Sequence, residues 1–172
     1  MANSAIRTAT AQDAEAVRAI YAFHVMHGTA TFDTEAPDRA FWEAKIVAVQ
    51  ARGWPFLVAM RGAAVIGYAY ATQFRDRAAY ARTCENSIYV ADALRGQGVG
   101  RLLLARLIEA ARGAGFEQMI AVIGGGEPAS VAVHGRAGFV LAGRMRDVGF
   151  KFGRKLDTVY LQKDLTQPDP FS

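Results

Sequence analysis

The residues with the clearest chemical potential form a glycine-rich loop at 95–101, with glycine at positions 96, 98 and 100. The apolar segment 87–90 before it is typical of a strand, and apolar residues recur at helical spacing after it. Glycine lets a ligand approach the backbone, and the first turn of a helix offers free N–H groups and the positive end of its dipole. With Arg95 and Arg101, this pattern predicts a phosphate-binding site, although a plain strand-to-helix connection also uses glycine.

The glycine spacing narrows the choice of phosphate ligand. A P-loop is excluded because no Gly-x-x-x-x-Gly-Lys-Ser/Thr occurs, and the third glycine comes one residue too early for the dinucleotide pattern Gly-x-Gly-x-x-Gly. Arg-x-x-Gly-x-Gly at 95–100, after an acid-bearing strand, resembles the pyrophosphate loop of the GCN5-related N-acetyltransferases. That resemblance implies acetyl-CoA as co-substrate, bound by Ile88, Tyr89, Val90, Arg95, Gly96, Gln97, Gly98, Val99, Gly100, Arg101, Glu127 and Ser130.

Acetyl transfer to an amine needs a base for the ammonium, donors for the developing oxyanion and an acid for the leaving thiolate. We expect Glu85 to be the base, because a carboxylate beside a buried cleft has its pKa raised and because the resemblance gives this glutamate that role. It also implies that the strand at 87–90 splays from its neighbour and frees the amides of Ile88 and Val90. His134 stands where superfamily members often have a tyrosine acid. A histidine bonded to a backbone carbonyl is an equally good interpretation.

The elements that must position these residues alternate along the whole chain. Hydrophobic periodicity and glycine or proline stops predict strands at 5–9, 54–60, 64–72, 80–90, 117–123, 139–146 and 156–165, with helices at 10–28, 37–53, 99–112 and 130–137. This order is that of the GNAT acyl-CoA N-acyltransferase fold. The resemblance therefore implies one α/β (α+β) domain at 1–165, with a mixed, mostly antiparallel central sheet and helices on both faces. Residues 166–172, with two prolines, are expected to form a disordered tail.

Three segments carry a narrower likeness. Residues 80–90, 121–134 and 149–157 contain Thr-x-Glu-x-Ser-Ile-Tyr-Val, Val-Ile-Gly and Gly-Phe-Lys-Phe-Gly-Arg-x-Leu-Asp, and they resemble the phosphinothricin and methionine sulfoximine N-acetyltransferases. The resemblance implies a homodimer and a small amino-acid-like acceptor. A guanidinium pairs well with a carboxylate or phosphinate, and the implied acceptor-binding residues are Phe32, Arg75, Arg77 and Tyr80.

Two positions depart from that family. Glu127 replaces a common asparagine whose side chain meets the cofactor, and Lys155 replaces a tryptophan. An ionised carboxylate cannot donate hydrogen bonds and would lie near anionic CoA. Two alternatives therefore stay open: a GNAT that acetylates another amine, such as a polyamine, a peptide N-terminus or an aminoglycoside, and a non-catalytic acyl-CoA-binding module.

Composition excludes several other classes of protein. The chain has 172 residues, 52% hydrophobic and 21% charged, which excludes a disordered chain and suits one domain. The net charge of +4 is spread over the chain, so we expect no nucleic acid partner. We find no apolar run of membrane-spanning length and no signal peptide, and Cys84 is the only cysteine. We therefore expect a cytoplasmic protein without a metal or a membrane partner.

Overall fold

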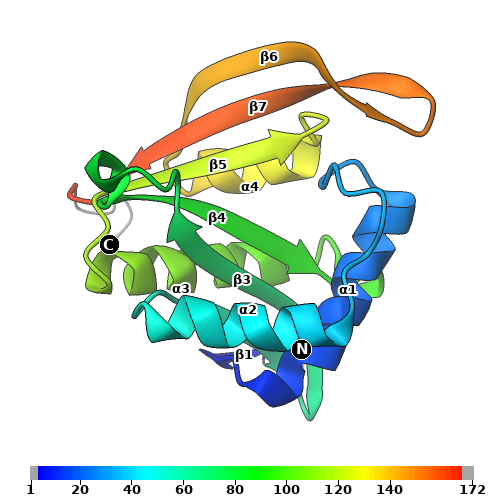
Figure 1. Ribbon diagram of the computed structural model, residues 1–172, viewed down its shortest axis with the longest axis vertical. Helices are drawn as coiled ribbons and strands as arrows, with labels where there is room; N and C mark the ends of the chain where they lie inside the picture. The colour runs from blue at the N-terminus through cyan, green and yellow to red at the C-terminus, as the bar shows by residue number, and fades with distance from the viewer. Residues whose placement is uncertain (1–3, 168–172) are drawn as a thin grey trace.

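The computed structural model, which describes residues 4–167, is a seven-stranded sheet with helices against both faces (Figure 1). The strand order is β1-β2-β3-β4-β5-β7-β6, and every neighbouring pair is antiparallel except β4 and β5. The strands are β1 (Ala5–Thr8), β2 (Phe56–Arg61), β3 (Ala64–Gln73), β4 (Thr83–Val90), β5 (Gln118–Gly124), β6 (Val140–Lys151) and β7 (Arg154–Asp164). The helices are α1 (Ala14–His27), α2 (Arg39–Ala51), α3 (Val99–Gly113) and α4 (Pro128–Arg136), with short 3-10 turns η1 (Ala11–Asp13), η2 (Ala78–Tyr80) and η3 (Asp92–Leu94). The mixed, mostly antiparallel sheet that the sequence predicted is confirmed.

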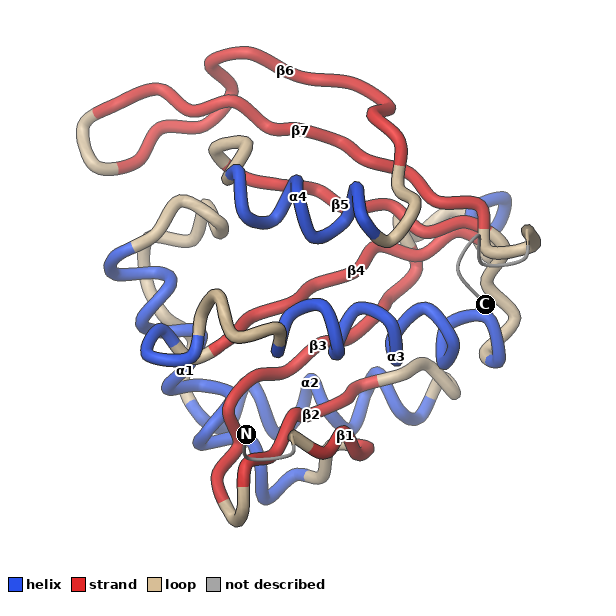
Figure 2. Tube along the Cα trace, turned by 180° about the vertical axis from the view of Figure 1, so that it is seen from behind, coloured by secondary structure: helices blue, strands red, loops and turns tan. Residues whose placement is uncertain are grey.

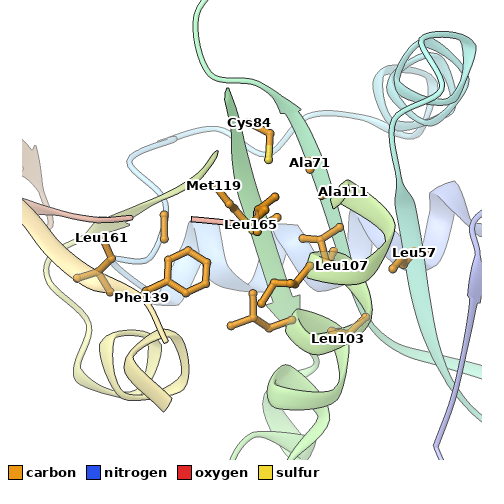
Figure 3. Packing of buried hydrophobic residues seen from close by; sticks show 14 of the residues in the cluster. Leu57, Ala71, Cys84, Leu103, Leu107, Ala111, Met119, Phe139, Leu161 and Leu165 are labelled. Carbon is orange, nitrogen blue, oxygen red and sulfur yellow. The ribbon is translucent and has the colours of Figure 1, made fainter. Parts of the chain in front are cut away.

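One face of the sheet is covered by α3 and α4. The apolar stripe of α3 is buried, as its spacing predicted, and Leu103 and Leu107 have no exposed surface. They join a cluster in which Cys84 and Met119, from neighbouring strands, are also fully buried (Figure 3). Burial of this size stabilises the fold by about 1.5–3 kcal/mol per large side chain. It fixes α3, and with it the glycine loop, against the sheet.

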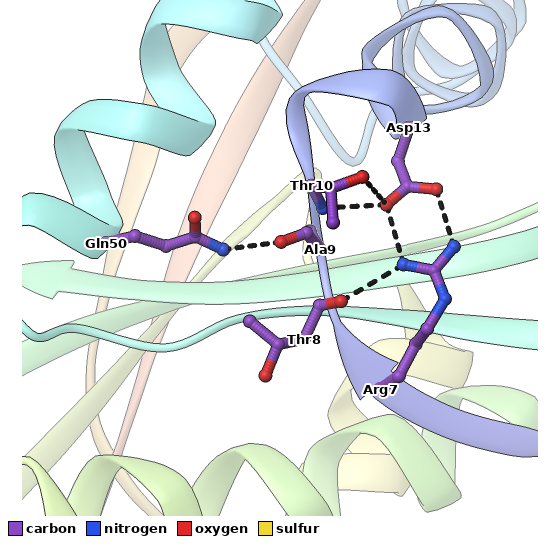
Figure 4. A network of polar contacts seen from close by, with 6 residues as sticks. All are labelled: Arg7, Thr8, Ala9, Thr10, Asp13 and Gln50. Atoms are coloured by element: carbon purple, nitrogen blue, oxygen red, sulfur yellow. Dashed lines mark hydrogen bonds and ion pairs between the residues drawn. The ribbon is translucent and has the colours of Figure 1, made fainter.

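The other face is covered by α1 and α2. A polar network before the start of α1 connects β1, α1 and α2 (Figure 4). Arg7 of β1 donates two hydrogen bonds of 2.7 Å to the carboxylate of Asp13, and the Thr10 amide donates a third, of 2.8 Å, to the same group. The Gln50 side chain donates to the Ala9 carbonyl at 2.7 Å and so ties α2 to the same corner. Thr10 and Asp13 are thus the helix entry that the sequence predicted.

Several predicted boundaries are wrong in physically informative ways. The strand expected from position 80 begins at Thr83, because Tyr80 belongs to η2 and its ring packs edge-on against Phe74 at 5.8 Å between centroids. The second helix begins after its N-cap Asp38 rather than at residue 37. The disordered tail stays a prediction: its first residue, Thr166, donates both its amide and its hydroxyl to Asp164. Residues 168–172 of that tail lie outside the described part of the chain.

The largest departure is the length of β6. It was expected to end at 146, where a charged residue and Gly149 follow, but it continues to Lys151 and forms a long hairpin with β7 that projects beyond the end of β5 (Figures 1 and 2). A bulge between Met145 and Gly149 shifts the register of β6 against β7, and Asp147 within it has a φ of 57°. The Asp157 carboxylate accepts from the Asp147 amide at 2.9 Å and from Arg144 Nε at 2.6 Å, which holds the bulge. None of the helices at 4–167 has the length and apolarity needed to cross a membrane.

Candidate active site

The site is built where two parallel strands separate. β4 and β5 pair from Thr83 with Gln118 to Asn86 with Ala121, and beyond that pair the strands part although both continue. The backbone direction of β4 follows from its other edge: Thr83 O accepts from Phe74 N, and Ala91 N donates to Ile66 O, both at 2.9 Å. Since N–H groups alternate along a strand, those of Ile88 and Val90 point toward the side from which β5 has withdrawn. The splay expected at 87–90 is therefore present.

A cavity of about 490 Å³ opens beside this part of β4 and reaches the glycine loop. Its walls include the predicted residues Ile88, Tyr89, Val90, Arg95, Gly96, Gly98, Gly100, Arg101, Glu127, Ser130 and His134. Gly98, the N-cap of α3, has a φ of 84°, which a side chain would rarely adopt. A Cβ built on Gly96 or Gly98 would meet no atom within 4 Å, so the loop presents bare backbone to open space. This concave backbone, the N-terminus of α3 and two arginines make a fitting anion cradle.

Glu85 lines a second cavity, of about 250 Å³, that shares Ile88, Tyr89 and His134 with the first. Its side chain is 32% exposed, and Arg75 Nη1 lies 3.9 Å from its Oε2. Burial raises the pKa of Glu85, while Arg75 and Lys45 oppose this shift. A half-buried carboxylate with a raised pKa, beside the free edge of β4, is well suited to accept a proton.

His134 bridges α4 and the point where the strands part. Its Nδ1 lies 2.8 Å from the Ser130 carbonyl oxygen, so Nδ1 carries a proton and donates. Its Nε2 lies 3.1 Å from Asn86 Oδ1, which can only accept, and burial lowers the pKa of His134. A neutral ring then needs a donor at Nε2. Turning the Asn86 amide by 180° supplies one, and it also gives Asn86 Nδ2 the partner that it lacks among the described residues. Both ring nitrogens are thus engaged, and the role of His134 as an acid stays a prediction.

The comparisons with known proteins agree with this geometry. Residues 6–160 match the family model described as an acetyltransferase (GNAT) domain. A phosphinothricin N-acetyltransferase from Alcaligenes faecalis is 46% identical over 165 residues, which cover 95% of this chain and 84% of that protein. The chain belongs to the GNAT acetyltransferase family. It is an N-acetyltransferase, as the sequence predicted.

Other relatives narrow its position within the GNAT family. An L-methionine sulfoximine/L-methionine sulfone acetyltransferase from Pseudomonas paraeruginosa is 40% identical over 95% of both chains. The structure of an acetyltransferase from Salmonella typhimurium with its cofactor acetyl-CoA superposes with a TM-score of 0.93 at 37% identity, covering 98% of this chain and 99% of that one. A phosphinothricin acetyltransferase from Sinorhizobium meliloti in complex with acetyl-CoA gives 0.92 at 42%, covering 95% and 89%. The predicted kinship with phosphinothricin and methionine sulfoximine acetyltransferases is confirmed.

Not every predicted site residue of this GNAT lies on a cavity wall. Gln97 donates its amide to the Ala93 carbonyl and accepts from Arg61, and Val99 is 3% exposed in the core below the loop. Arg77 and Tyr80 lie at η2, outside the walls of both cavities, and Arg75 reaches the site through Glu85. Phe32 does line the cavity of Glu85. Sequence reasoning missed four polar wall residues: His24, Thr31, Asn86 and Thr158. Only His24, between Phe23 and Val25, carries a usable signal, a polar side chain within an apolar segment.

The family departure at Glu127 has a structural explanation. Its Oε2 accepts from the Ser130 amide at 2.8 Å and caps α4, and its Oε1 lies 3.3 Å from Arg95 Nη2. The carboxylate is therefore placed by a helix cap and neutralised by a cation of the glycine loop. This contact balances the charge beside the anion cradle, where an unpaired carboxylate would repel phosphate.

Proposed function

We propose that this GNAT transfers the acetyl group of acetyl-CoA to the α-amino group of a small amino-acid analogue of the phosphinothricin or methionine sulfoximine type. The observation that carries the proposal is Glu85, a half-buried carboxylate of raised pKa beside the free edge of β4. A binding module would need the phosphate cradle but no such base. The cradle and the base open into cavities that share walls.

The cofactor half of the proposal rests on the fit of the 490 Å³ cavity. The backbone of 96–100 and the N-terminus of α3 would hold the pyrophosphate, with Arg95 and Arg101 supplying charge. The N–H groups of Ile88 and Val90 would bind the acetyl oxygen and the pantetheine arm. Two relatives of known structure contain acetyl-CoA, which supports this assignment.

The acceptor half rests on the smaller cavity and on the relatives. The relatives include phosphinothricin N-acetyltransferases and L-methionine sulfoximine/L-methionine sulfone acetyltransferases. An L-amino acid N-acyltransferase from Escherichia coli is 37% identical over 95% of this chain and 97% of that protein. Phe32 lines this cavity, and Arg75 lies at the Glu85 carboxylate. Arg77 and Tyr80, at η2 outside the cavity walls, would meet the part of a bound acceptor that extends beyond the cavity. Arg75 already lies beside Glu85, so one cation would both pair with an anionic acceptor and tune the base.

In the proposed reaction, Glu85 takes a proton from the acceptor ammonium, which frees the lone pair that attacks the thioester carbon. The N–H groups of Ile88 and Val90 stabilise the negative charge that develops on the acetyl oxygen. Collapse breaks the carbon–sulfur bond and releases thiolate. As the amide forms, the attacking nitrogen loses a second proton. We propose that His134 passes this proton to the thiolate: its Nε2 leaves Asn86 and takes up the proton, and the resulting imidazolium donates it to sulfur.

An acceptor screen tests the proposal. The enzyme is incubated with acetyl-CoA and L-methionine sulfoximine, phosphinothricin, spermidine, an alanine-initiated peptide or kanamycin, and free thiol is measured. We expect release with the first two at rates well above those of the others. Release only with spermidine, peptide or kanamycin would assign another acceptor class, and binding of acetyl-CoA without any thiol release would support the non-catalytic module.

We also propose a homodimer formed through the β6–β7 hairpin. β6 is an edge strand of the described sheet and exposes large apolar side chains: Val140 at 66%, Leu141 at 68%, Met145 at 44%, Val148 at 54% and Phe150 at 71%. Such a surface favours a second copy, because large apolar side chains exposed on an unpaired edge strand favour association. Light scattering should give twice the mass of the 18.6 kDa chain, and Phe150→Glu should shift it toward the monomer.

A further inference from the structure

Thr158 of β7 lines the cavity of Glu85, and the same β6–β7 hairpin also holds a wall of this cavity through one buried lysine. Lys151, the last residue of β6, is only 5% exposed, and its hydrogen-bond partners are distant in the sequence. Its ammonium donates to the Gly28 carbonyl and to the Thr31 carbonyl, both at 2.9 Å. Gly28 is the C-cap of α1, so the cation also lies at the negative end of that helix dipole.

The segment that Lys151 holds is a wall of the cavity of Glu85. Residues 30–32 line that cavity, and they belong to the loop between α1 and α2. On its other side the loop is held by Tyr21, whose hydroxyl lies 2.7 Å from Thr31 Oγ1 and donates to Asp33 at 2.6 Å. The loop is thus fixed between α1 and β6, and the lysine supplies the donor for two of its backbone carbonyls, those of Gly28 and Thr31.

Phe32 sits in a slot that glycine makes possible. A Cβ built on Gly149 would lie 2.3 Å from Phe32 Cε2, and one on Gly124 would lie 2.9 Å from Phe32 Cε1. The ring is therefore fitted between the end of β5 and the bulged part of β6. Two devices act on the same side chain: Lys151 fixes the backbone of its loop, and Gly149 leaves room for its ring.

We propose that Lys151 is a positioning residue for the acceptor, which acts by holding the 28–32 segment so that Phe32 forms a wall of the cavity that Glu85 also lines. This inference deepens the proposed function and rests on it for the identity of the acceptor. Lys151 touches neither the reacting atoms nor the cradle, and of the 28–32 segment only Ala30 also lines the 490 Å³ cavity, so its loss should act chiefly on the acceptor. The bulge in β6, which the sequence did not predict, is what brings Gly149 and Lys151 to this loop.

The test compares Lys151→Met, Lys151→Arg, Gly149→Ala and the control Arg154→Met, which removes an exposed cation from the same hairpin. With L-methionine sulfoximine as acceptor, Lys151→Met and Gly149→Ala should raise its KM by about 10–100-fold, the usual effect of misplacing a positioning contact. The KM for acetyl-CoA should stay within about twofold, and Lys151→Arg should recover part of the loss. Arg154→Met should match the parent.

A mutant cycle with Phe32→Ala separates this role from a general loss of stability. In the Phe32→Ala background, Lys151→Met and Gly149→Ala should add less than about twofold, because coupled residues are not additive. Equal increases in both KM values, or full additivity with Phe32→Ala, would overturn the inference. Hydrogen exchange gives a readout that needs no acceptor. Lys151→Met should speed amide hydrogen exchange at 28–34 and leave exchange in α3 unchanged. Unchanged exchange at 28–34 would refute the positioning role of Lys151, even if the acceptor screen assigned a different acceptor.

Discussion

Replacing Glu85 by glutamine tests the chemistry most directly, because the amide keeps the shape of the side chain but cannot take up a proton. General-base catalysis contributes roughly 10²–10⁴-fold, or about 2.7–5.4 kcal/mol at 1.36 kcal/mol per tenfold. The Glu85 side chain is 32% exposed, so water retains a route to the ammonium. We therefore expect the fall in turnover to lie in the lower part of that range, at about 10²–10³-fold.

The pH dependence follows from the direction of the pKa shift. Burial raises the pKa of Glu85, so the group becomes protonated, and catalysis is lost, at a higher pH than for an exposed glutamate. The parent should gain activity as the base and then the acceptor amine lose their protons. Glu85→Gln should keep only the amine limb, and its activity should approach that of the parent at high pH, where free amine is abundant.

Steady-state assays of thiol release over a range of pH, with calorimetric titration of acetyl-CoA, provide the measurement. Binding of acetyl-CoA should survive, because the cradle is formed by the loop before α3. Glu109→Gln is the matched control, since Glu109 is an exposed member of an ion pair on α3 with a side chain that is 61% exposed. If Glu85→Gln kept the parent's rate and profile, Glu85 would be structural and the amine would lose its proton by another route.

Three further predictions use the same preparations. Arg75→Ala removes a cation that lowers the pKa of Glu85, so the acid limb of the pH–rate profile should move to higher pH, and an unmoved limb would show that the 3.9 Å ion pair does not persist in solution. Gly98→Val places a side chain at a φ of 84° on the cradle, so calorimetry should show acetyl-CoA binding at least about tenfold weaker, and unchanged affinity in a folded variant would refute the cradle. The pKa of Asp13 is lowered, chiefly by its hydrogen bonds from Arg7, so its stabilisation is present above the unfolded pKa of about 3.9 and is lost as pH falls through the folded value. Urea unfolding at pH 7 should show Asp13→Ala less stable by about 1.5–3 kcal/mol, a difference that shrinks in acid, and equal destabilisation at both pH values would remove the ion-pair explanation.

The sequence could predict those structural features that are determined by residues close together in the chain. Helix α3 and its glycine loop were predictable because an apolar stripe, three glycines and a stop signal lie within twenty or so residues. The entry to α1 was predictable for the same reason, since Thr10 and Asp13 form a local cap. The core on α3 then follows from burial, which hydrophobic spacing reports well, whereas the mixed sheet was predicted only through the resemblance to the GNAT fold.

The sequence predictions failed where a side chain bonds to a partner that is distant in the sequence. Polar Asp147 and Gly149 look like a strand end, yet the Asp157 carboxylate of the neighbouring strand satisfies the bulge and lets β6 continue. In the sequence Lys151 looks like an ordinary surface lysine, but in the fold it bonds to Gly28, which lies 123 residues away along the chain. Glu127 looked unfavourable beside an anionic cofactor because its cation, Arg95, lies 32 residues away. In each case the local sequence shows an unsatisfied group, and the partner becomes visible only in three dimensions. A charged residue that breaks a local pattern is therefore better treated as a sign of a long-range contact than as the end of an element, and here such contacts converge on the acceptor wall and the cofactor cradle.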